Sequence, residues 1–103
     1  MKYRVFWSPE AERQFESILT DRYVYDQAVE AARDIDAVLM NDPLGFGESR
    51  TETIRVGFIR PLDVQYDVLT DVQTVVVEDV WRIDQRRYPF NRSVRQVKLS
   101  CRL

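Results

Sequence analysis

The chain has 103 residues, which is enough for one small domain with a single hydrophobic core. Apolar residues make up 45% of it and charged residues 31%, which excludes an intrinsically disordered chain, and no apolar run approaches the roughly 18–20 residues that cross a bilayer. Histidine is absent, which excludes Ser-His-Asp and Cys-His nucleophile systems and a histidine-based zinc site, and we expect neither a metal nor a cofactor.

The N-terminus and the single cysteine indicate a cytoplasmic protein. The first apolar stretch ends at Ser8-Pro9, so we expect no signal peptide. Cys101 is the only cysteine and cannot form an internal disulfide, which fits a reducing cytoplasm. We expect no membrane partner.

The net charge of −2 conceals an uneven distribution. Residues 1–81 hold 8 basic and 16 acidic side chains, a balance of −8, whereas residues 82–103 hold 7 basic side chains against Asp84, a balance of +6. A basic terminal segment of this kind either meets a polyanion or folds back on the acidic body of its own chain.

The N-terminal half predicts one strand followed by two helices. Residues 2–7, KYRVFW, alternate and are rich in aromatic and β-branched types, which predicts a strand. Ser8 can cap a helix and Pro9 suits its first position, so the first helix should run from Pro9 to about Thr20. Apolar residues at helical spacing predict a second helix over about 26–40, and the two helices should form an antiparallel hairpin.

The second half changes to a period of two residues. After a loop at 44–48, residues 50–59, 62–69 and 73–83 each alternate and predict three strands. The order β-α-α-β-β-β defines an α+β domain over residues 1–103, with an antiparallel sheet, the helical hairpin packed on one face, and a basic C-terminal tail from about residue 84. The other face should be bare, and we expect it to carry the positive groups of the closing strand.

No set of carboxylates has the spacing of a metal site. Glu78 and Asp79 are adjacent in the last predicted strand, so they should face opposite sides of it and should not form one pair.

The opening YRVFWSPEAERQFESI and the closing pair VQYDV…TVVVEDVWR resemble the RelE/ParE superfamily, whose members are toxins of bacterial type II toxin–antitoxin and plasmid stabilisation systems. The resemblance covers about residues 2–88. It implies either a ribosome-dependent mRNA endonuclease of the RelE type or an inhibitor of DNA gyrase of the ParE type. It also implies an antitoxin protein that wraps around the toxin and neutralises it.

The resemblance implies a site made of arginines and one tyrosine. Arg82 ends the last strand and Tyr88 follows six residues later, which matches the spacing of the RelE-like site. Anchoring the pattern on Tyr66 puts Asp63 where the family has an arginine, while a shift of three residues offers Arg60 instead. Arg60 and Arg82 would stabilise phosphate charge, and Tyr88 would stack on a base or transfer a proton.

Three further arginines are candidates for nucleic-acid binding. Arg86 and Arg87 alternate with aromatic residues, as in many nucleic-acid binders, and Arg55 lies on the strand where the family has lysines. For each site residue the alternative is a plain structural role, such as a solvent-exposed strand end or turn.

Two hypotheses of different classes therefore stand. The first is a toxin that acts on mRNA and the ribosome or on DNA gyrase. The second is a catalytically degenerate relative that acts as a protein-binding module, with a homodimer as one possibility. The absence of lysine from residues 50–59, the carboxylate of Asp63 and a pI of about 5.1 favour the second.

Overall fold

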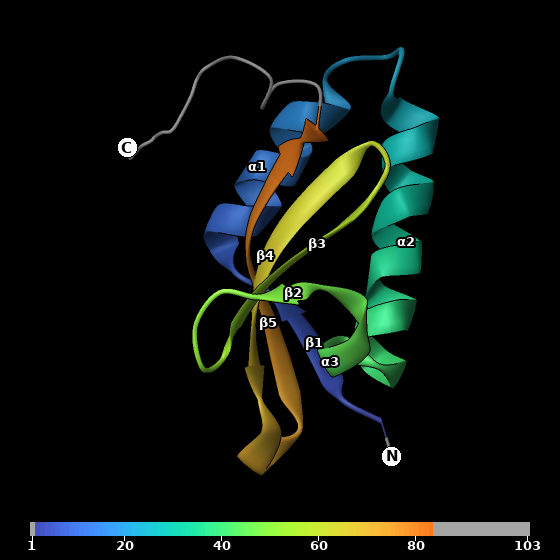
Figure 1. The fold of residues 1–103 in the computed structure, drawn as a ribbon. Helices are drawn as coiled ribbons and strands as arrows, with labels where there is room; N and C mark the ends of the chain where they lie inside the picture. Colours follow the sequence, from blue (N-terminus) through green and yellow to red (C-terminus); the bar gives the residue numbers. More distant parts are fainter. Residues whose placement is uncertain (1, 84–103) are drawn as a thin grey trace.

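The computed structural model describes residues 2–83 and has the α+β architecture that the sequence predicts (Figure 1). It adds α3 and β2, two short elements in the segment expected to be a loop, while the tail expected from residue 84 lies outside the described residues. The elements are β1 (Arg4–Trp7), α1 (Pro9–Leu19), α2 (Tyr25–Asn41), α3 (Pro43–Phe46), β2 (Glu48–Ser49), β3 (Ile54–Ile59), β4 (Leu62–Leu69) and β5 (Thr74–Arg82).

The first helix begins where the sequence predicts. The Oγ of Ser8 accepts a hydrogen bond from the backbone N–H of Ala11 at 3.0 Å, and Pro9 occupies the first turn, where no N–H is needed. The hydroxyl of Ser8 also donates to the carbonyl of Glu78 at 3.2 Å. The cap therefore starts the helix and fixes its first turn against β5.

The sheet is mixed, which corrects the expectation of a purely antiparallel one. Its strand order is β1-β5-β4-β3-β2, and every neighbouring pair is antiparallel except β1 and β5, which run parallel from Arg4 opposite Thr74 to Trp7 opposite Val77. Parallel neighbours need a long connection between them, and here the helices and the β2–β4 strands supply it.

Both long helices cover one face of the sheet. Figure 1 shows α1 alongside β5 and α2 across from the β3–β4 hairpin, which agrees with the contacts between these elements. The shared core joins helix residues to inward-facing residues of the two central strands: Ala11, Ile18, Ala28, Ala31, Ile35 and Leu39 with Leu62, Val64, Tyr66, Val68, Val75, Val77 and Val80.

A β-bulge in β5 reverses the side-chain alternation near its end. The register shifts between Gln65 and Tyr66, so that these two residues face Asp79 and Val77. Because Val77 and Val80 both belong to the core, the two residues between them, Glu78 and Asp79, both lie outside it. The two carboxylates have different partners: Nε2 of Gln14 in α1 donates to Asp79 at 3.1 Å, whereas Glu78 hydrogen-bonds with Gln65 of β4, and the expectation that they do not form one pair stays a prediction.

The face of the sheet turned away from the helices is called the open face here. Among residues 2–83, the strand register assigns to it residues that include Arg4, Phe6, Ile54, Val56, Phe58, Asp63, Gln65, Asp67, Val76 and Trp81, and the bulge adds Glu78. Within the same range, no helix is long and apolar enough to span a membrane.

Candidate functional site

A cleft of about 510 Å³ opens between α2 and the turn that joins β3 to β4, and it brings together two of the predicted site residues. Arg60 lies in the turn, and Arg82 ends the neighbouring strand β5. The lining of this cleft, called the α2–turn cleft, combines apolar and charged residues: Val24, Gln27, Glu30, Ala31, Asp34, Ile59, Arg60, Pro61, Arg82 and Ile83.

Arg82 lies on the helix side of the sheet, which corrects the expectation that it lies on the bare face. It is paired with Leu62, a fully buried core residue, and directly opposed residues share a face. Its Nη1 donates to Oδ2 of Asp21, just beyond the end of α1, at 2.9 Å, and its side chain is only 18% exposed. The guanidinium therefore already has a carboxylate partner.

Asp21 is held as an anion by local hydrogen bonds. The backbone N–H of Tyr23 donates to its Oδ1 at 2.9 Å, and this bond, followed by the one from Arg82, lowers the pKa of the Asp21 carboxyl below its ordinary value of 3.8. One carboxylate thus fixes both the turn after α1 and the end of β5.

Asp21→Asn should change how stability depends on pH. Because the pKa of Asp21 is lower in the folded state, its ionised form stabilises the fold above the unfolded pKa, and that contribution is lost as the pH falls through the folded pKa. We expect the wild type to be more stable than the variant at neutral pH and the difference to disappear in acid, below about pH 3.8. Urea denaturation across pH measures this.

The control for that titration is Asp26→Asn. Asp26 is an exposed residue of α2 for which no hydrogen bond or ion pair is found within the described part of the chain. A pH profile of Asp26→Asn that matched that of Asp21→Asn would contradict the assigned role of Asp21.

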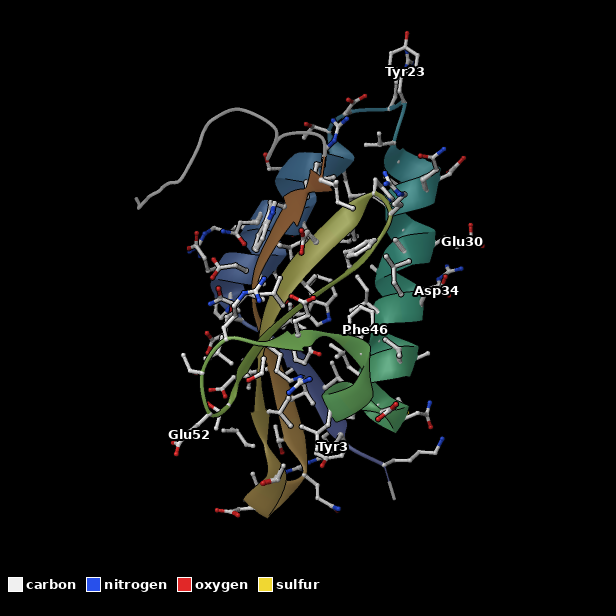
Figure 2. The ribbon with its side chains drawn as sticks, in the orientation of Figure 1. Tyr3, Tyr23, Glu30, Asp34, Phe46 and Glu52 are labelled. Carbon is white, nitrogen blue, oxygen red and sulfur yellow. The ribbon has the colours of Figure 1, made fainter. Side chains whose placement is uncertain are left out.

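Arg60 is the exposed cation of the cleft. Within residues 2–83 it makes no hydrogen bond or ion pair, and two acidic residues of α2, Glu30 and Asp34, also line the cleft; Figure 2 shows both along α2. A cleft with two arginines and two carboxylates does not concentrate positive charge as a phosphate site does. It suits a polar protein segment with charges of both signs.

Arg55 has a structural position. It is paired with Tyr66 on the helix side of the sheet, and its Nη2 donates to the carbonyl of Gly47 at 2.6 Å. Burial raises the pKa of the Tyr66 hydroxyl, and the neighbouring guanidinium opposes that effect. The nucleic-acid role of Arg55 stays a prediction; Arg86, Arg87 and Tyr88 lie outside the described residues.

The open face carries carboxylates that the sequence did not predict to lie together. Asp63 is 2% exposed, and Asp67 lies near Glu78, whose pKa is raised mainly by burial and then by the negative charges of Asp67 and Asp79. The signal for this grouping is the alternation of β4, which places residues 63, 65 and 67 on one face.

The fold has close relatives in shape among toxin–antitoxin complexes. Neither a family model nor a curated protein matches the chain by sequence. The RelBE2 toxin–antitoxin complex of Mycobacterium tuberculosis matches with a TM-score of 0.63 and 20% identity over 80% of this chain and 92% of that one.

Two further solved structures agree. The chromosomal ParDE system of P. aeruginosa matches with a TM-score of 0.59 and 17% identity over 79% of this chain and 96% of that one. The archaeal RelE–RelB complex of Pyrococcus horikoshii matches with a TM-score of 0.53 and 18% identity over 80% and 96%. The chain therefore has the RelE/ParE fold, and the resemblance predicted from the sequence is confirmed at the level of the fold.

Proposed function

We propose that this chain is the toxin of a type II toxin–antitoxin pair and that an antitoxin protein neutralises it. The shared fold supports this proposal, because the three structures described above are toxin–antitoxin systems and the match spans between 92% and 96% of the matched chains. Fold alone does not fix an activity, and the charges of the site bear on the target.

We infer that the target is a protein, with DNA gyrase as the candidate, rather than mRNA on the ribosome. The observation that carries this inference is the ion pair between Arg82 and Asp21, which occupies the best candidate for a phosphate-binding arginine. Carboxylates also line both the α2–turn cleft and the open face. RNA binding draws much of its affinity from cations placed against phosphates, and residues 2–83 hold 9 basic against 16 acidic side chains.

The carboxylates of the open face favour a second candidate function. A catalytically degenerate protein with this fold would bind a partner without arresting growth. It differs from a toxin in one observable consequence, since producing it alone would be harmless.

Production of the chain alone in bacteria tests both candidates. We expect growth arrest that co-production of the antitoxin relieves, together with loss of supercoiling by purified gyrase and intact mRNA on ribosomes. Cleaved mRNA would overturn the protein target. Unimpaired growth with folded, soluble chain would overturn the toxin proposal and support the degenerate module.

Arg60→Ala should weaken target inhibition. Exposed arginines at the centre of a binding surface often dominate its affinity, so we expect the concentration for half-maximal gyrase inhibition to rise about tenfold. The matched control is Arg33→Ala, which removes an exposed arginine of α2 outside the cleft and should leave inhibition unchanged. Equal effects of the two variants would mean that only net charge matters.

A further inference from the structure

The open face holds two neighbouring carboxylates, Asp67 and Glu78, for which no ion pair is found within residues 2–83. Oδ1 of Asp67 is fully buried and has no hydrogen-bond partner. Glu78 lies beside it in the bulge of β5, and the two carboxylates repel each other. The cation that the register assigns to this face within residues 2–83, Arg4, lies over the ring of Phe6, with its Cζ 5.8 Å from the ring centroid.

Such a grouping is costly unless something positive covers it. A carboxylate oxygen withdrawn from water without a donor loses its hydration and gains nothing in return. Burial, followed by the negative charges of Asp67 and Asp79, raises the pKa of Glu78, and a hydrogen bond with Gln65 opposes this rise only in part. The surroundings are apolar and accessible, since Phe58 is 58% exposed and Phe6 is 51% exposed.

The rest of this chain has the complementary chemistry. Residues 84–103 hold six basic side chains and one acidic one, Asp84, a balance of +5, together with Phe90 and several aliphatic residues. This segment begins directly after Ile83. Trp81, two residues before Ile83, lies on the open face opposite Asp63. Twenty residues reach up to about 66 Å when extended, which exceeds the 38 Å length of the described body.

We propose that residues 84–103 dock on the open face of the sheet, with their cationic side chains against Asp67 and Glu78 and their apolar side chains over Phe58 and Phe6. The proposal does not depend on the toxin function. The sequence left two alternatives for the basic terminal segment, a polyanion or the acidic body of its own chain. The proposal favours the second.

The full-length chain carries its own probes for a test. Cys101 is the only cysteine, so a nitroxide spin label attached to it marks the segment alone. The chain has two tryptophans: Trp81 belongs to the open face, while Trp7 lies on the helix side, where its Nε1 donates to Asp36 at 2.7 Å. In ¹⁵N-labelled protein, we expect the label to attenuate the indole signal of Trp81 several-fold more than that of Trp7.

Charge variants test what holds the segment in place. Asp67→Asn combined with Glu78→Gln should reduce the attenuation at Trp81 several-fold, and added salt should act in the same direction because it screens ion pairs. The matched control is Glu12→Gln combined with Glu16→Gln, which removes the same charge from exposed positions of α1 and should change nothing. If the open-face variant fails to fold, the comparison of the two indoles in the wild type still decides.

Three outcomes would overturn the proposal. Equal attenuation of the two indoles, or stronger attenuation of Trp7, would place the segment elsewhere, and absence of attenuation at low salt would mean that it does not dock. A final sample mixes spin-labelled ¹⁴N chain with ¹⁵N chain that carries no spin label. If Trp81 is attenuated there as strongly as in ¹⁵N chain that carries its own spin label, the segment of a second copy occupies the open face.

Discussion

Tyr66→Ala should lower the free energy of unfolding by about 3–5 kcal/mol, the range found when a buried aromatic side chain is removed from a core. Tyr66 is fully buried in β4, and its ring stacks on Phe46 of α3 with centroids 6.0 Å apart. Its hydroxyl donates to the carbonyl of Pro43 at 2.8 Å. The substitution would therefore open a cavity and detach α3 from the sheet at the same time. Chemical denaturation measures the loss.

Tyr66→Phe separates the two contributions. It keeps the ring and removes the hydroxyl, which leaves the carbonyl of Pro43 without its donor and should cost about 1–3 kcal/mol. A loss as large as that of Tyr66→Ala would mean that the hydrogen bond, rather than the packing of the ring, dominates. No loss in either variant would contradict the assigned contacts.

Gly47→Ala should cost about 1–3 kcal/mol, as overpacking of a filled site does. A Cβ at this position would lie 2.5 Å from the backbone oxygen of Val56 and 2.8 Å from the hydroxyl of Tyr66. Backbone in the middle of a sheet cannot move aside as a side chain can, so the strain must be borne by the β2–β3 pairing. Thermal denaturation and the exchange of β3 amide protons report the damage.

The control for Gly47 is Gly45→Ala, two residues earlier in the same segment. The three atoms nearest to a Cβ there belong to the side chain of Asp42, which is exposed and can rotate away at the cost of the hydrogen bond that it accepts from the N–H of Gly45. We expect a smaller loss of stability from this variant. The reverse order of the two losses would show that the close approach of Gly47 to β3 is not what requires glycine.

Local chemistry predicted most of the elements. The cap at Ser8, the proline at the start of α1 and the apolar spacing of α2 depend on neighbours a few residues away, so the sequence carries them directly. The strands β3 to β5 follow from alternation in the same way. What escaped prediction was α3, a single turn whose cap, Asp42, lies just after the end of α2.

The face occupied by Arg82 could not be predicted, because it depends on one extra residue in a strand. Strict alternation from Val75 and Val77 would turn Arg82 to the open face. The bulge moves the alternation by one position, so that Val80 and Arg82 face the helices instead. Bulges of this kind are fixed by contacts with the partner strand, and those contacts are not visible in a local pattern.

The candidate site was predicted in part. The sequence suggested that Arg60 and Arg82 act together, and both line one cleft. It did not suggest that carboxylates complete the wall, because Glu30 and Asp34 have the spacing of an ordinary solvated helix face. The packing of α2 on the sheet brings Glu30 and Asp34 to the cleft beside the turn that holds Arg60.

The parallel pairing of β1 with β5 makes folding a late event in synthesis. Arg4 finds its neighbour Thr74 only after seventy further residues have been added, so the first strand leaves the ribosome long before its hydrogen-bonding partner exists. A nascent chain cannot assemble this sheet in order of emergence. Translation of nearly the whole described body must finish before the protein acquires any surface that depends on the completed sheet.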